Sequence, residues 1–315
     1  MHAVPVAAAQ QLHDPASGSP QANAYALAVL CWLLSAGVYI AAKWVAPEMP
    51  PWALCFWRLT LACAILLPIV HRHHEHMIAL VKSRAVEVLI IAAIGLTICQ
   101  GMMYTGLNYT GATTAGLIMA LSPVMTMVLA RIVLGEPLGL WKALGAALSL
   151  VGMLVIVARG DLTALPQLQV NPGELWIVGS ALCWAIYTVL LRRSKFELEL
   201  LPLVVLLLGA GAIAALPFYL WEMIHGERSA LHLNGILALA YVAGPGGALM
   251  YFLYNRSVET LGAGRASMLL YLQTVFVAML AYLLLGESLH GYDLAGAGFI
   301  VAGLVLANFI RPRKT

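Results

Sequence analysis

Charged side chains are scarce in this sequence. Asp, Glu, Lys and Arg make up 10% of its 315 residues and hydrophobic residues make up 62%, whereas soluble proteins carry about 25% charged residues. This composition excludes an ordinary soluble domain and predicts a membrane protein whose solvent is the lipid bilayer. The net charge of +3 gives no sign of a nucleic-acid partner, and we expect none.

Cysteine is also rare, and its spacing excludes several kinds of site. The five cysteines are an odd number without metal-ligand spacing, so we expect no disulfide framework, no metal and no cofactor. Four histidines cluster in HRHHEH at 71–76, but Arg72 and Glu75 among them favour a solvated loop over a metal site. No histidine lies in the middle of an apolar run, so we expect no intramembrane enzyme.

Long apolar runs follow one another along almost the whole chain. Each is about 20 residues long, which is enough for a helix to cross a hydrocarbon core of roughly 30 Å. We therefore expect an all-α membrane protein with ten transmembrane helices joined by short connections. The ten runs are 24–45, 52–70, 87–107, 112–134, 138–158, 174–193, 200–221, 234–255, 263–285 and 291–310.

Lys and Arg are unevenly divided between the two sides of this predicted bundle. With the N-terminus inside, most of them fall on the inner side, and only Lys43, Arg159 and Arg228 face outward. Because basic loops stay in the cytoplasm, both termini are predicted to be cytoplasmic, in a bacterial inner membrane. Residues 1–23 lack the basic start of a cleavable signal peptide and are expected to form a disordered tail. Residues 311–315 are expected to be a basic cytoplasmic C-terminus.

The chain repeats itself with a shift of 151 residues. That shift superposes residues 110–138 on residues 261–289 and brings similar patterns of glycine, alanine and glutamate into register. Further matches are Gly145 with Gly296 and Gly152 with Gly303.

We therefore expect two five-helix repeats, at 24–158 and 174–310, joined by an external linker at 159–173. Five is an odd number, so the second repeat must enter the membrane from the opposite side. Inverted repeats place a central cavity between the two halves and allow it to open to either side in turn, which favours transport by alternating access.

The pentapeptide LGEPL at 134–138 returns as LGESL at 285–289. Gly135 can end one helix in a left-handed conformation, and Glu136 can cap the next helix with its carboxylate. Glu287 would do the same in the second copy. Because a carboxylate stabilises the start of a helix, we favour capping over the alternative of an ion carrier.

Three motifs carry a family resemblance: LSPV at 121–124, LGE at 134–136 and GAALSLVGMLVIV at 145–157. With its five-plus-five spans, the chain resembles the drug/metabolite transporter (DMT) superfamily, in particular the EamA-type ten-span carriers. Within that group it looks most like the YddG-type exporters of aromatic amino acids. Thr274 stands where the family pattern has proline, so Pro123 is expected to bend its helix more than the matching helix bends. The resemblance implies a central cavity lined by the first, third, fourth, sixth, eighth and ninth helices.

Polar and aromatic side chains recur on single faces of these predicted helices. Gln100, Tyr104 and Asn108 are four residues apart and share a face, which is costly to expose to lipid. The alternative is that such residues join helices or form belts at the membrane interface. The candidate substrate-binding residues are Trp32, Tyr39, Gln100, Tyr104, Asn108, Ser122, Trp184, Tyr187, Tyr251, Asn255 and Gln273.

Arg58 is the one basic residue placed clearly inside a predicted helix. An intramembrane charge marks a functional site by default. Its helix is not expected to line the centre, so we favour snorkelling to the outer surface or bonding to backbone carbonyls. Binding of a substrate carboxylate is the alternative.

The acids discriminate between transport mechanisms. Every Asp and Glu can be placed at a helix end, in a loop or in the tail, so no buried acid is available to carry protons. We expect facilitative export of aromatic and other neutral amino acids, or of similar small metabolites, by a monomer. The alternatives are drug or other metabolite efflux, proton coupling through Glu136, Glu222, Glu259 or Glu287, and a purely structural membrane protein, which would give no reason for inverted halves.

Overall fold

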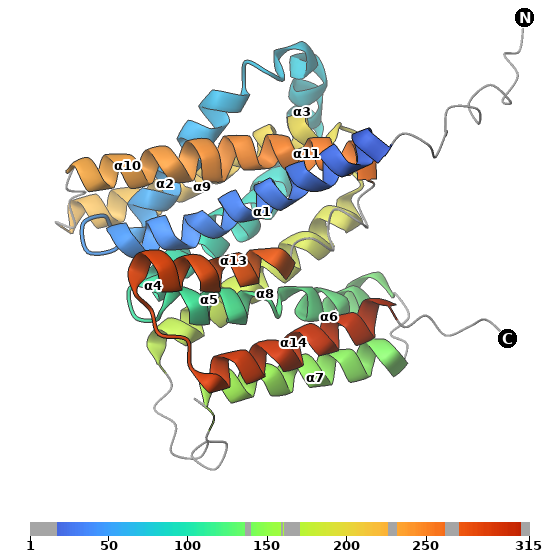
Figure 1. Ribbon diagram of the computed structural model, residues 1–315. Coiled ribbons are helices and arrows are strands. Elements are labelled where there is room, and N and C mark those ends of the chain that lie inside the picture. The colour runs from blue at the N-terminus through green and yellow to red at the C-terminus, as the bar shows by residue number, and fades with distance from the viewer. Residues whose placement is uncertain are drawn as a thin grey trace, which may run out of the picture.

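Helix covers the greater part of every predicted apolar run (Figure 1). The computed structural model describes residues 18–135, 140–158, 160, 171–225, 232–261 and 271–309. Within these ranges it contains no strand, which confirms the prediction of an all-α protein.

Two of the predicted spans in the part before residue 159 are interrupted. A π-helical segment, η3 (Ala93–Ile98), joins two helices into one long span, and another span breaks just before Pro123, where a bend was expected. The helices of this part are α1 (Gly18–Val45), α2 (Pro51–Leu66), α3 (His74–Ala92), α4 (Cys99–Leu107), α5 (Ala112–Met119), α6 (Ser122–Leu134) and α7 (Leu140–Val157).

The part after residue 170 has a related pattern of helices. A second π-helical segment, η5 (Gly244–Leu249), lies 151 residues after η3, and a third, η6 (Ala281–Leu285), follows a helix that continues through Thr274 without a break. The helices are α8 (Pro172–Ser194), α9 (Leu200–Ile224), α10 (Leu233–Ala243), α11 (Met250–Leu261), α13 (Tyr271–Leu280) and α14 (Gly291–Phe309).

Two details differ from the sequence prediction near residue 70. Helix α2 ends at Leu66 rather than at residue 70, because Pro68 has no N–H with which to continue the helix. The HRHHEH stretch was expected to be a loop, but it forms the 3₁₀ turn η2 (His71–His73) and the start of α3. No group of three or more potential metal ligands occurs in the part of the chain that the structure describes.

Several helical segments are long and apolar enough to cross a membrane. The chain is therefore a multi-pass membrane protein. In addition, the structure has three shorter apolar helical stretches, Pro51–Leu66, Ala143–Ile156 and Leu272–Leu285. The six long segments are Ala22–Val45, His71–Leu107, Ala112–Leu134, Pro172–Ser194, Leu200–Ile224 and Leu233–Tyr254.

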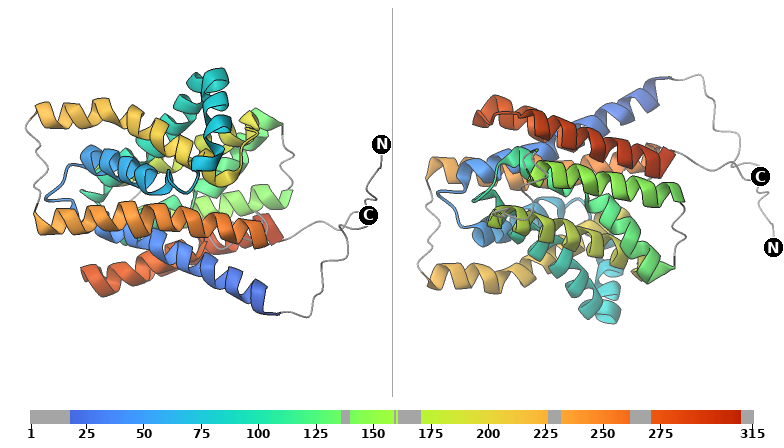
Figure 2. Two further views of the ribbon diagram at one scale, coloured as in Figure 1. Left: turned by 90° about the horizontal axis from the view of Figure 1, so that it is seen from above. Right: turned by 90° about the horizontal axis from the view of Figure 1, so that it is seen from below.

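Helices α7 and α14 lie side by side at one edge of the bundle, and α14 ends at the same end of the bundle where α1 begins (Figures 1 and 2). A Cβ atom on Gly152 would lie only 2.6 Å from the carbonyl oxygen of Gly296. Small residues allow this close approach of two helix backbones, which is a common way of packing helices in membranes. The close contacts pair Gly145 with Gly303, Gly152 with Gly296 and Ser149 with Ile300.

The predicted helix end at Gly135 is confirmed. Gly135 has φ 69° and ψ 15°, and Gly286, 151 residues later, has φ 65° and ψ 21°. Both glycines end a helix in the left-handed conformation that side chains with a Cβ avoid. Glu136 lies outside the described residues.

Candidate functional site

A cavity of about 580 Å³ lies between helices of the two halves. Residues of α1, α4, α5, α6, α8, α11 and α13 form most of its wall, which agrees with the helices that the family resemblance implies. Two further helices contribute: α9 supplies apolar side chains such as Leu203 and Leu207, and α2 supplies Arg58.

Most of the candidate residues line this cavity. Tyr251 comes from α11, 151 residues after Gln100 on α4, so the predicted polar faces of both halves reach the same space. The candidate residues in the wall are Trp32, Tyr39, Gln100, Ser122, Trp184, Tyr187, Tyr251 and Gln273.

Two candidate residues, Tyr104 and Asn108, are not part of the wall, and the side chain of a third is not described. Tyr104 is buried, with 2% of its surface exposed, and its hydroxyl has no hydrogen-bond partner within the described structure. Asn108 is exposed at the C-terminal end of α4. Asn255 is a helical residue of α11 whose side chain lies outside the described part.

Aromatic rings form much of the cavity wall. Trp32 and Tyr254 meet edge to face, with ring centroids 5.7 Å apart and planes at 68°, and the rings of Trp184 and Tyr187 are 5.2 Å apart. The indole Nε1 of Trp32 is buried without a hydrogen-bond partner in the described structure. Such a wall suits a ligand with an apolar or aromatic part and a few polar groups.

Part of the polar lining is bonded within the protein. Thr126 Oγ1 donates a hydrogen bond to the carbonyl of Ser122 at 2.7 Å, which is the common bonding of a threonine to its own helix. This contact fixes the position of a hydroxyl group that a ligand would meet.

Arg58 is a cavity residue that the candidate set did not include. The expectation that its helix does not line the centre is wrong, and so is snorkelling, because only 4% of Arg58 is exposed. Bonding to backbone carbonyls is confirmed: Nε donates to the oxygen of Val242 at 3.2 Å and Nη2 to that of Gly246 at 3.5 Å. The only sequence signal was the charge itself, in the middle of an apolar run.

The described wall of the cavity reaches one end of the bundle but not the other. Its wall extends to Arg192 and Leu200, beside the connection between α8 and α9. At the opposite end, Lys43 Nζ donates to the carbonyl oxygens of Leu107 at 2.6 Å and Thr110 at 2.9 Å. A cation there suits the C-terminal end of α4, and this contact ties α1 to the turn between α4 and α5.

Glu287 closes the same end, in a way that differs from the prediction. Its carboxylate oxygens accept the backbone N–H groups of Ala112 at 2.7 Å and Thr113 at 3.0 Å, at the start of α5. The expectation that Glu287 caps the helix directly after it is therefore wrong, because it caps a helix of the other half. For α14, the carboxylate of Asp293 accepts the backbone N–H of His290 at 3.0 Å.

Glu222 has a related structural role. Its carboxylate accepts the N–H groups of Trp52 at 3.1 Å and Ala53 at 2.8 Å, at the start of α2. No described carboxylate lines the cavity. Glu136 and the side chain of Glu259 lie outside the described part.

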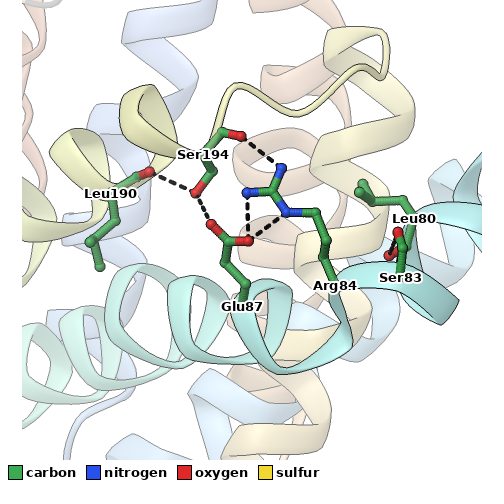
Figure 3. Close-up of polar contacts among 6 residues, drawn as sticks. All are labelled: Leu80, Ser83, Arg84, Glu87, Leu190 and Ser194. Carbon is green, nitrogen blue, oxygen red and sulfur yellow. Dashed lines mark hydrogen bonds and ion pairs between the residues drawn. The ribbon is translucent and has the colours of Figure 1, made fainter.

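A second depression, of about 810 Å³, lies at the surface around Arg84. Figure 3 shows the polar contacts of Arg84 there. Arg84 Nε donates to Glu87 Oε2 at 2.6 Å, its Nη1 donates to the carbonyl of Ser194 at 2.7 Å, and Ser194 Oγ donates to Glu87 Oε1 at 2.6 Å. These charges are paired with each other and hold a non-helical residue of α3 against the end of α8. The central cavity is therefore the better candidate for a binding site.

Comparison with known proteins identifies the family. A model described as the EamA-like transporter family matches the chain twice, at residues 22–158 and 171–309. A solved crystal structure that is 19% identical aligns with a TM-score of 0.57 over 93% of this chain and 99% of that one, which shows a shared fold.

Curated relatives are similar over most of their length. The uncharacterized transporter YyaM of Bacillus subtilis is 25% identical over 91% of this chain and 93% of its own. The uncharacterized inner membrane transporter YicL of Salmonella typhimurium is 27% identical over 82% of this chain and 85% of its own. A probable amino-acid metabolite efflux pump of Salmonella typhimurium is 26% identical, over 92% of this chain and 95% of its own.

Proposed function

The chain belongs to the EamA-like transporter family, and from this premise we propose that it exports amino acids, aromatic and other neutral ones, or similar small metabolites. The observation that carries the proposal is the cavity itself, which lies between helices of both halves and combines aromatic rings with the amides of Gln100 and Gln273. Its volume of about 580 Å³ falls within the range of about 300–1,000 Å³ found for small-molecule sites.

The proposed mechanism is alternating access between two inverted five-helix repeats with ten spans in total. A two-fold relation between the halves makes contacts reciprocal. If one residue contacts the equivalent of a second residue in the other half, then the second residue contacts the equivalent of the first. The contacts of Gly145 with Gly303 and of Gly152 with Gly296 have this form. The π-helical segments 151 residues apart and the two matches to one family model give further support.

We propose facilitative transport because the described part of the wall contains no acid. Glu222 and Glu287 accept backbone N–H groups at helix starts, which gives each a structural role. Movement of substrate down its own gradient needs no titrating group. Proton coupling is the alternative.

The substrate class follows from the chemistry of the wall. Among the described wall residues the cations are the buried Arg58 and Arg192 at the open end of the cavity. This arrangement suits a phosphate group poorly, whereas amide, phenol and ring groups suit an amino acid. The relative named as a probable amino-acid metabolite efflux pump supports the same class. Efflux of apolar drugs is the second candidate, favoured by the aromatic wall.

The proposed location is a bacterial inner membrane, with both termini in the cytoplasm. The apolar helices and the excess of Lys and Arg on one side of the bundle support this orientation. In that orientation the cavity of this structure reaches the cytoplasmic end, beside Arg192, and the contacts of Lys43 and Glu287 close the outer end.

Counterflow in sealed proteoliposomes tests the proposal. Vesicles are loaded with unlabelled phenylalanine or leucine and given a trace of labelled amino acid outside, with and without an imposed pH gradient. A facilitative carrier accumulates label transiently and ignores the gradient. Accumulation only with the gradient would replace facilitation by proton coupling, and accumulation of drugs but of no amino acid would favour the second candidate.

Gln100→Ala is expected to reduce counterflow about five- to tenfold. Removal of one hydrogen-bonding group from a binding site costs about 1–1.5 kcal/mol, and 1.4 kcal/mol is a factor of ten. The matched control is Thr105→Ala on the same helix, whose hydroxyl donates to the carbonyl of Gly101 at 2.8 Å and does not reach the cavity. Wild-type flux in Gln100→Ala would remove this amide from the site.

A further inference from the structure

Arg58 is a buried cation with unused hydrogen-bonding capacity. Its side chain is 96% buried, and the two carbonyl oxygens of Val242 and Gly246 engage only Nε and Nη2. Nη1 is buried and has no partner within the described structure. An arginine carries five N–H donors in a planar fork, so the N–H groups of Nη1 are left without an acceptor among the described residues.

No carboxylate of the described residues lies within 4.0 Å of Arg58 to neutralise it. The groups that interact electrostatically with Arg58 include the phenols of Tyr39, Tyr104 and Tyr251 and the thiols of Cys55 and Cys99, all ordinarily uncharged at neutral pH. Breaking or omitting one partner of a buried ion pair is strongly unfavourable. An anion from outside the protein would relieve this cost.

The surroundings are suited to hold such an anion. The hydroxyl of Tyr104, which interacts electrostatically with Arg58, is also buried without a partner in the described structure. The carbonyls that hold Arg58 belong to η5 or lie just before it, and π-helical segments occur frequently at functional sites. They hold Nε and Nη2 of Arg58, which is a residue of the cavity wall.

We propose that Arg58 binds the carboxylate of the transported molecule, so that this carrier selects amino acids and other carboxylic acids against amines and neutral compounds. The inference rests on the proposed transport function and names the feature of the substrate that the cavity recognises. A carboxylate matches the guanidinium in charge and in planar, two-pronged geometry. Apolar drugs without an anionic group would leave the cation unpaired.

The test uses wild-type protein in the counterflow assay, with phenylalanine as the labelled substrate and three unlabelled competitors. Phenylalanine and 3-phenylpropionate keep the carboxylate, and phenylalaninamide replaces it with a neutral amide. We expect the amide to compete at least 30-fold more weakly than phenylalanine, which is about 2 kcal/mol. Equal competition by the amide would overturn the inference while leaving transport established. Absence of counterflow for leucine as well as phenylalanine would overturn the proposed transport function instead.

A variant adds a second, independent readout. In Arg58→Gln we expect competition by phenylalanine to weaken about 30-fold and competition by phenylalaninamide to stay unchanged, with partial recovery in Arg58→Lys. The control is Arg72→Gln, an exposed charge outside the cavity, which should keep the wild-type preference. Equal loss for both ligands in Arg58→Gln would mean a purely structural role. If this variant does not fold, the wild-type competition series decides.

Discussion

Gly152→Val is expected to prevent accumulation of folded protein in the membrane. A Cβ atom at this position would lie 2.6 Å from the carbonyl oxygen of Gly296 and 3.0 Å from the backbone nitrogen of Ile300. Both obstacles are backbone atoms of α14, so no side-chain rotation can relieve the overlap, and the two helices must separate. The result is measured as the yield of monodisperse protein after detergent extraction and as its thermal stability.

The size of this effect follows from how the two helices are packed. Overpacking a core typically costs about 1–3 kcal/mol, and displacement of a whole helix also breaks the neighbouring close contact of Gly145 with Gly303. We therefore expect a loss of at least about 3 kcal/mol, which is a large part of a typical net stability of 5–15 kcal/mol.

Gly298→Val is the matched control on α14. Gly298 is exposed, and a Cβ atom there would have nothing within 4 Å. It is expected to accumulate like the wild type, since the added methyl groups face lipid. Normal yield and stability of Gly152→Val would show that α7 and α14 do not pack in this way.

The glycines illustrate what the sequence could predict and what it could not. The shift of 151 residues matched Gly145 to Gly296 and Gly152 to Gly303 as equivalent positions. In the structure, however, Gly145 contacts Gly303 and Gly152 contacts Gly296. A two-fold relation between the halves produces such contacts, but the matching of equivalent positions does not by itself predict them. The apolar helical segments and the left-handed helix end at Gly135 depend on local sequence, and these were predicted.

The sequence predictions for Arg58, expected away from the centre, and for Asn108, expected at the binding site, were wrong for geometric reasons. The spacing of four residues put Gln100, Tyr104 and Asn108 on one face, but eight residues of helix rise about 12 Å. Asn108 therefore lies at the end of α4 while Gln100 lines the cavity. Arg58 faces the centre because α2 packs against α9, α10 and η5, and neighbours so distant in sequence cannot be read from its own segment.

Glu287→Ala is expected to lower the stability of the purified protein by about 1–2 kcal/mol, as loss of a helix cap does. Its carboxylate accepts two N–H groups at the start of α5, and the sequence pattern could not indicate a partner helix some 175 residues away. Alanine leaves both donors without this acceptor at the closed end of the bundle. The measurement is the midpoint of thermal unfolding in detergent, with Glu197→Ala, an exposed carboxylate, as the control that stays at the wild-type value.

Glu287→Gln separates capping from proton transfer. Glutamine keeps a carbonyl oxygen that can accept one of the two N–H groups but has no charge and cannot carry a proton. If capping is the role, stability decreases from wild type to Gln to Ala, and counterflow in the Gln variant responds to a pH gradient as the wild type does. If Glu287 is a proton site, the Gln variant keeps wild-type stability and loses a response to the gradient that the wild type has. Under alternating access the outer end can open only when these contacts break, so a weakened cap also favours the outward-open state.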